Sequence, residues 1–210
     1  MMRAFFFIAA MAAGFAAAAQ EMPSGAEQLQ HFYAEVREFH ARFEQAVLDE
    51  NLSRLEESAG VVWISRPGKF RWDYEQPAAQ QVVSNGVKLW VYDPDLAQVT
   101  VRNSGDALGE TPAFLLAGRG DLEARYRVED RGVQGALAWV ALSPKSPRSN
   151  YREIRIGFDG GELRVLELVD GLDQTTRMTF FALADGEGEG DDSRFEFTPP
   201  PGVDVLDESG

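Results

Sequence analysis

The chain of 210 residues contains no cysteine and only two histidines, His31 and His40. The lack of cysteine excludes disulfides, thiolate metal ligands and a thiol nucleophile. The two histidines are too far apart along the chain to match the helical spacing of a zinc site. The sequence also lacks a G-x-S-x-G elbow and a phosphate-binding glycine loop. We therefore expect no enzyme activity, no metal and no cofactor.

Basic residues are scarce as well. Lysine and arginine total 20 against 34 aspartate and glutamate, which gives a formal net charge of −14. Nucleic-acid binding requires a basic surface, and anionic lipid attracts basic segments, so the composition disfavours both partners. An acidic surface keeps a protein soluble and separate from its copies, which predicts a monomer.

Residues 1–19, MMRAFFFIAAMAAGFAAAA, combine one positive charge, an apolar run and a small-residue end before Gln20. This arrangement is typical of a cleaved signal peptide, and the run is short for a membrane span. We therefore expect export, with residues 20–210 forming one mature domain. A lipid anchor on a bacterial exported protein is attached through a cysteine, so the chain is expected to be unanchored.

Most of the remaining sequence alternates apolar and polar residues, which is the period of a β-strand. The clearest case is RPGKFRWDYEQP, residues 66–77, in which Phe70, Trp72 and Tyr74 alternate with charged residues. An Asn-Gly pair in QQVVSNGVKLWVYD predicts a hairpin turn. About eleven such strands in succession predict a mainly β fold, an unclosed antiparallel β-barrel.

Two segments break this alternation. Residues 24–43 read SGAEQLQHFYAEVREFHARF, in which an apolar face recurs every three or four residues: Leu29, Phe32, Tyr33, Val36 and Phe39. This spacing predicts an amphipathic helix of about four turns capped by Ser24. The segment ETPAFLLAGRG predicts a short apolar helix that is capped by Thr111, begins at Pro112 and is ended by Gly118 and Gly120. Helices across the mouth of a half-barrel would form a lid over an apolar cavity. A further segment, about residues 186–193, is acidic and glycine-rich and predicts a mobile loop.

Four segments, in this order, resemble the periplasmic outer-membrane lipoprotein carrier proteins of the LolA family: RPGKFRWDYEQP, VSNGVKLWVYDPDLAQVTV, TPAFLLAGR and FEFTPPPGV. The resemblance implies an open barrel of eleven strands, covered at one end by helices, whose cavity accepts the acyl chains of a lipoprotein. It also implies two partners, an inner-membrane ABC release complex and an outer-membrane receptor. The receptor of such a pathway is lipid-anchored, so a chain without cysteine resembles the carrier.

The resemblance further implies that Arg66 holds the lid shut by bonding the backbone at the end of the short helix, near Leu116 and Ala117. Helix C-termini leave carbonyls unpaired, and arginine offers several donors, so the contact is physically sensible. A surface arginine fixed by Pro67 is the alternative. The candidates for the acyl-chain cavity and lid are Phe70, Trp72, Trp90, Phe114, Leu115, Leu116 and Ala117.

Two alternatives stay open. In the first, these residues fill an ordinary aromatic core, although the four tryptophans are expected to converge with the apolar helix. In the second, the same half-barrel is a periplasmic carrier or sensor of another lipid, a glycolipid or a phospholipid. A sensor usually has an additional domain, for which this chain has no room.

Overall fold

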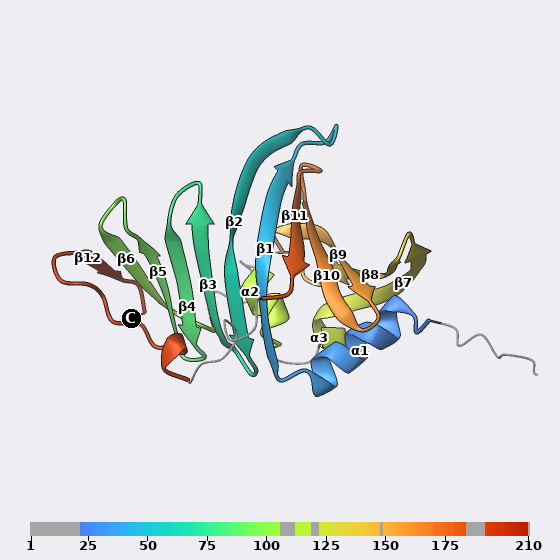
Figure 1. The fold of residues 1–210 in the computed structure, drawn as a ribbon, viewed down its shortest axis with the longest axis horizontal. Helices are drawn as coiled ribbons and strands as arrows, with labels where there is room; N and C mark the ends of the chain where they lie inside the picture. The colour runs from blue at the N-terminus through green and yellow to red at the C-terminus, as the bar shows by residue number, and fades with distance from the viewer. Residues whose placement is uncertain (1–21, 106–111, 119–121, 148, 184–191, 210) are drawn as a thin grey trace, which may run out of the picture.

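The computed structural model describes residues 22–105, 112–118, 122–147, 149–183 and 192–209 (Figure 1). Within them, twelve strands form one sheet in the order β12-β6-β5-β4-β3-β2-β1-β11-β10-β9-β8-β7. The sheet does not close, because β12 and β7 remain as its two edges. All neighbours are antiparallel except β12, which pairs parallel with β6. The structure confirms the predicted half-barrel and adds one strand to the expected eleven.

The elements follow the chain in a long meander. The strands of the first half are β1 (Glu38–Leu48), β2 (Arg54–Ser65), β3 (Lys69–Gln76), β4 (Gln80–Asn85), β5 (Lys88–Asp93) and β6 (Gln98–Asn103). The helices are α1 (Gly25–Glu35), α2 (Pro112–Leu116), α3 (Leu122–Arg125) and the 3-10 helix η1 (Asp192–Phe195). The strands of the second half are β7 (Tyr126–Gln134), β8 (Leu137–Pro144), β9 (Tyr151–Asp159), β10 (Glu162–Asp170), β11 (Thr175–Phe181) and β12 (Asp204–Asp207).

The first helix begins as predicted and ends earlier. Ser24 accepts from the backbone N–H of Glu27, and the Glu27 carboxylate accepts in return from the Ser24 backbone, which forms a capping box. α1 ends at Glu35, and β1 begins at Glu38, so Phe39 belongs to the strand rather than to the helix. Phe39 fits both the helical and the strand pattern. It comes seven residues after Phe32, which is two helical turns, and two residues before Ala41, the next buried residue of β1. Pairing of β1 with β2 selects the strand.

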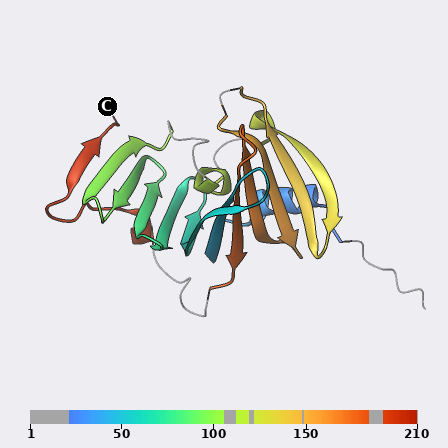
Figure 2. The ribbon, with the colours of Figure 1, turned by 90° about the horizontal axis from the view of Figure 1, so that it is seen from above.

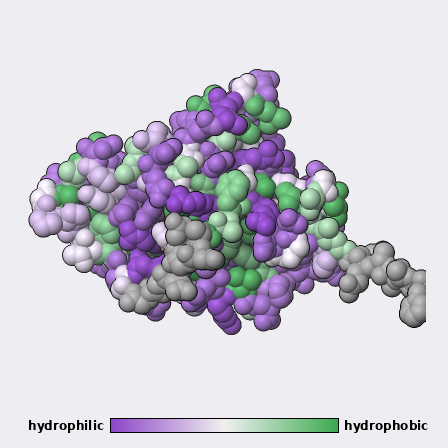
Figure 3. All heavy atoms as spheres, viewed as in Figure 1, coloured by the Kyte–Doolittle hydropathy of each residue, from purple (hydrophilic) through white to green (hydrophobic). Residues whose placement is uncertain are grey.

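The main core cluster lies on the concave face of the sheet. It joins α1, α2 and the inward residues of β1–β3 and β8–β11, and includes Leu29, Phe32, Phe43, Ile64 and Leu166. Figure 2 shows the strands as an arc with α2 on its inner side. The face shown in Figure 3 is mostly hydrophilic, with apolar residues interspersed. Because residues of α1 and α2 belong to the main core cluster, the two helices cover the apolar interior of the arc.

Several predicted features fall outside the described residues. The signal peptide, residues 1–19, is among them, and so is most of the predicted acidic loop, residues 186–191. The last two residues of that loop are described, and they belong to η1 rather than to a loop. Asp192 is held there by an ion pair of 2.6 Å between its carboxylate and the Nζ of Lys69.

The start of α1 lies directly on the backbone of β8. A Cβ built on Gly25 would lie 2.4 Å from the carbonyl carbon and oxygen of Trp139 and 2.9 Å from the amide nitrogen of Val140. The neighbouring atoms belong to the strand backbone, so a side chain at this position would fit only if α1 or β8 moved. Glycine at this position therefore lets α1 approach the sheet closely.

We expect Gly25→Ala to lower the free energy of unfolding by about 1–3 kcal/mol, the usual cost of overpacking. The measurement is denaturant unfolding followed by circular dichroism. The control is Gly171→Ala, because nothing lies within 4 Å of a Cβ built at Gly171. Equal midpoints for the two variants would show that α1 can move outward at no cost.

Candidate functional site

The three rings of β3 face the concave side together. Phe70 is 0% exposed and Trp72 is 3% exposed, and both belong to the main core cluster, against which Tyr74 packs. Arg71 and Asp73, which alternate with these rings, are partly exposed and form an ion pair of 2.8 Å. The predicted alternation over this strand is confirmed. The rings share one apolar interior with the helices.

The short helix α2 closes over this interior. Leu115, Leu116 and Ala117 are all buried in the same cluster. The side chain of Phe114 lies outside the described residues. Gly118 follows the helix with φ of +61°, a left-handed conformation that favours glycine, and its N–H donates to the carbonyl of Leu115. The predicted start at Pro112 is confirmed, and the helix ends at Leu116, two residues before Gly118.

Arg66, on the turn between β2 and β3, reaches under both helices. Its Nε donates to the carbonyl of Leu116 at 2.9 Å. Its Nη1 donates to the carbonyl of Phe32 at 2.7 Å and to that of Val36. The guanidinium carbon also lies 4.2 Å from the centroid of the Phe32 ring. One side chain therefore ties the barrel rim to the C-terminal ends of α1 and α2.

The electrostatics of this contact are favourable. The last carbonyls of a helix have no intrahelical partner and carry partial negative charge, which a guanidinium complements. Burial lowers the pKa of the Arg66 guanidinium from its ordinary value, although arginine still keeps its proton at neutral pH. The acceptor near the end of α2 was expected from the family resemblance. The two acceptors on α1 were not, because no local pattern links residue 66 to that helix.

The turn that carries Arg66 is itself held in place. The backbone N–H of Arg66 donates to the carbonyl of Arg37 at 2.9 Å, and that of Gly68 donates to the carbonyl of Ala117 at 3.1 Å. The hydroxyl of Ser84, which is 0% exposed, donates to the carbonyl of Gly68 at 3.0 Å. The turn is therefore bonded to β4 on one side and to the lid on the other.

The structure does not bring the four tryptophans together. Only Trp72 faces the interior, and the prediction for Trp90 is wrong about its face. On β5, Leu89 joins the main cluster, while Trp90 joins a second cluster on the opposite face. Trp63 lies beside Arg194 there, and Trp139 lines a depression formed mostly by charged residues. The stretch KLWVYD is apolar at both alternate sets of positions, so its sequence alone did not fix which set faces inward.

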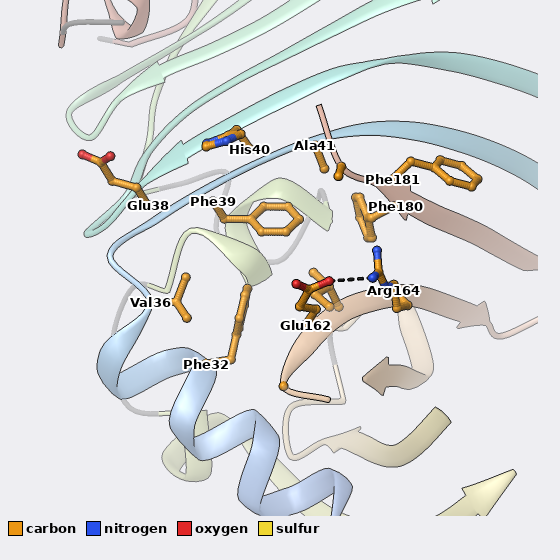
Figure 4. Close-up of a pocket in the computed structure, with 13 residues that line it drawn as sticks. Phe32, Val36, Glu38, Phe39, His40, Ala41, Glu162, Arg164, Phe180 and Phe181 are labelled. Atoms are coloured by element: carbon orange, nitrogen blue, oxygen red, sulfur yellow. Dashed lines mark ion pairs between the residues drawn. The ribbon is translucent and has the colours of Figure 1, made fainter. Parts of the chain in front are cut away.

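A cavity of about 280 Å³ opens between the end of α1 and the facing ends of β1, β10 and β11 (Figure 4). Its apolar lining includes Phe32, Phe39 and Phe180, and the Phe39 ring lies 5.9 Å from that of Phe32 and 5.6 Å from that of Phe180. An ion pair of 2.6 Å between Glu162 and Arg164 lies at its rim. Phe32 and Phe180 belong to the main cluster and Phe39 packs against it, so the cavity borders the covered interior.

This cavity was not among the sequence candidates. The apolar spacing of α1 had marked Phe32 and Phe39 as inward-facing, but Phe180 is distant in the sequence. In the described part of the chain, no helix has the length and apolar character to cross a bilayer. Nor do any three acidic or histidine side chains there lie close enough together to hold a metal ion.

An open, mostly antiparallel half-barrel, with helices tied over its apolar concave face by a partly buried arginine, defines a lid-covered half-barrel class of protein. The family model described as "Outer membrane lipoprotein carrier protein LolA" matches residues 34–198, and the chain belongs to this family.

Relatives of known description are similar to this chain over most of its length and of their own. An "Outer-membrane lipoprotein carrier protein" from Dechloromonas aromatica is 42% identical over 87% of each chain. Another so described, from Methylococcus capsulatus, is 43% identical over 93% of this chain and 92% of its own. A crystal structure of an uncharacterized conserved protein from Thermus thermophilus covers 87% of this chain and 98% of its own at 10% identity, with a TM-score of 0.54. That structural likeness supports the fold alone.

Proposed function

We propose that this protein is a periplasmic chaperone that carries outer-membrane lipoproteins and shields their acyl chains on the concave face of its half-barrel. The observation that carries the proposal is Arg66, a partly buried cation that holds two helices over an apolar interior. A simple core would not need a polar tie at this place. Membership of the carrier family and the names of the relatives support the same function.

The energetics require such a cover. Each CH₂ group of an acyl chain exposed to water costs about 0.8 kcal/mol, so three long chains represent tens of kcal/mol. The cavity of about 280 Å³ is below the usual range for even a drug-sized ligand. Acyl chains therefore enter only when the lid moves and the inner faces of α1 and α2 are exposed to them.

Arg66 and its hydrogen bonds to α1 and α2 act as a polar latch on the lid, and this latch explains how cargo is later released. Closed, the lid residues cover the rings of β3, and open, both surfaces contact acyl chains. The two states need to differ by only a few kcal/mol for cargo or a partner to shift the balance. Phe70, Trp72, Leu115, Leu116 and Ala117 are the proposed acyl-contacting set. No covalent chemistry by the carrier is needed in this scheme.

The finer parts of the proposal concern place and partners. Residues 1–19 direct export and are removed, and residues 20–210 form a single carrier domain that works as an unanchored monomer in the periplasm. The carrier receives lipoprotein from an inner-membrane ABC release complex, which supplies the energy. It then passes the cargo to a lipid-anchored outer-membrane receptor. It needs neither cofactor nor metal.

The test is native mass spectrometry of the protein purified from a periplasm in which an outer-membrane lipoprotein is also produced. We expect a one-to-one adduct with the triacylated lipoprotein, lost when the cargo lacks its acylated cysteine. An adduct with a glycolipid or phospholipid instead would replace the proposal with the alternative carrier. A protein that binds no acyl chain in this experiment would contradict both.

A further inference from the structure

A second side chain ties the lid, and it does so between the two helices. Tyr33 lies in the last turn of α1, and its hydroxyl donates to the carbonyl of Leu115 in α2 at 2.5 Å. Arg66 connects each helix to the barrel rim, whereas Tyr33 connects the helices directly to each other. This contact joins residues 82 positions apart in the sequence.

We propose that Tyr33 is a second latch of the lid, a positioning residue that locks α2 to α1 and holds the half-barrel closed together with Arg66. The inference rests on the proposed carrier function and concerns how the same site is regulated. Tyr33 was part of the apolar face predicted for α1. Nothing in the local sequence assigns its hydroxyl a partner.

The bonds at the end of α2 support this role. The carbonyl of Leu115 accepts from Tyr33, that of Leu116 accepts from Arg66, and that of Ala117 accepts from the backbone N–H of Gly68. A helix leaves its last carbonyls without intrahelical partners. Here three successive carbonyls are bonded by donors from outside the helix, so lifting α2 breaks all three bonds.

α2 depends on such ties because it is short. With five residues, it is far below the length at which an isolated helix is stable in water. By contrast, α1 is anchored independently at its other end. Gln28, which is buried, accepts from the N–H of Gly161 at 2.7 Å and donates to the carbonyl of Pro23 at 2.7 Å. Tyr33 therefore bonds α2, which is too short to be stable alone, to α1, which is anchored independently.

Charge and burial make the two latches complementary. Burial raises the pKa of the Tyr33 phenol well above its ordinary value, so the hydroxyl stays a neutral donor at physiological pH. The guanidinium carbon of Arg66 lies 5.1 Å from the centroid of the Tyr33 ring. Loss of the arginine frees both helices from the rim but leaves them joined. Loss of the tyrosine hydroxyl frees α2 from α1 while the rim still holds each.

The test compares Tyr33→Phe, which removes only the hydroxyl, with Tyr92→Phe, the same change on the opposite face of the sheet. The first measurement is hydrogen exchange of residues 112–118 in the empty protein. We expect exchange in Tyr33→Phe to be about five- to tenfold faster, the effect of losing one buried hydrogen bond. Exchange in Tyr92→Phe should match that of the wild-type protein.

The second measurement is the equilibrium affinity for a dansyl-labelled fatty acid. A closed lid competes with the ligand, so weakening it should raise the apparent affinity of Tyr33→Phe by about the same factor. A purely structural role would lower thermal stability and leave the affinity unchanged or lower. In an Arg66→Leu background, where the lid is already open, the effect of Tyr33→Phe on affinity should shrink towards none.

The outcomes separate the latch from the carrier function. Unchanged exchange of residues 112–118 in Tyr33→Phe would overturn the latch, even if the protein binds fatty acid. So would exchange that rises together with a fall in affinity. If exchange rises but the wild-type protein binds neither fatty acid nor lipoprotein, the latch stands and the carrier function fails.

Discussion

Arg66→Leu is expected to produce a carrier that takes up lipoprotein and does not pass it on. The change removes the bonds from the guanidinium to the carbonyls of Leu116, Phe32 and Val36. The leucine cannot replace any of them. Closing the lid then no longer releases enough free energy to expel the acyl chains, so the loaded state persists.

The size of this effect follows from the number and type of the bonds. Hydrogen bonds from a charged donor contribute about 1.5–3 kcal/mol each, so losing two or three shifts the lid equilibrium by at least about a hundredfold towards the open state. The carbonyls left behind become hydrated when the lid opens. The free energy of global unfolding should therefore fall by only about one or two kcal/mol.

The measurement has two stages, uptake of lipoprotein from inner-membrane vesicles and transfer to the isolated outer-membrane receptor. Uptake by Arg66→Leu should equal that of the wild-type protein, while transfer falls at least about tenfold. Arg54→Leu is the control, because the Arg54 side chain is 61% exposed, pairs with Glu57 and lies at the opposite end of β2 from the turn that carries Arg66. Normal transfer by Arg66→Leu would remove the latch from the mechanism.

The strand pattern of the concave face could be predicted from sequence where apolar and charged residues alternate strictly. This was so for β3, whose rings were correctly placed inside. It was not so for β5, where Trp90 and Leu89 are both apolar and only the pairing with β4 and β6 decides the face. Similarly, β12 has four residues and pairs in parallel with a strand about a hundred positions earlier, which no local pattern indicates.

The candidate site, too, could be predicted from the sequence only in part. The boundaries of α2 were predictable because proline and glycine have local conformational reasons to stand at its ends. The contact of Arg66 with Leu116 was predictable only through the resemblance to a family. Its bonds to α1, and the bond of Tyr33 to α2, depend on how elements distant in sequence meet. Those contacts required the fold.

Phe70→Glu is expected to give a folded protein with an open lid that no longer collects lipoprotein. Phe70 is 0% exposed and lies opposite Ile64 at the start of β3, next to the turn that bonds the lid. In the closed state its carboxylate would be buried without a partner, which costs several kcal/mol. Opening the lid lets water reach this position, so the lid and not the sheet should yield.

The opposite expectation applies to a position that no lid motion can hydrate. Ile156 is also 0% exposed, but it lies within β9 between its partners Val140 and Leu166. Ile156→Glu should therefore lose its cooperative thermal transition. The matched pair places the same carboxylate in the same cluster, at its rim and inside it. Thermal melts and hydrogen exchange of residues 112–118 measure the two effects separately.

Uptake of lipoprotein from inner-membrane vesicles then decides between a core and an adjustable interior. If the rings of β3 only fill a core, Phe70→Glu should melt as Ile156→Glu does, and Phe70→Ala should cost the usual 3–5 kcal/mol or so of a large core truncation. If they line the acyl-chain site, Phe70→Ala should cost less than that, because the lid already tolerates separation from them. Phe70→Glu should then retain a transition, exchange rapidly at α2 and take up no lipoprotein, because a carboxylate stands where the acyl chains must lie.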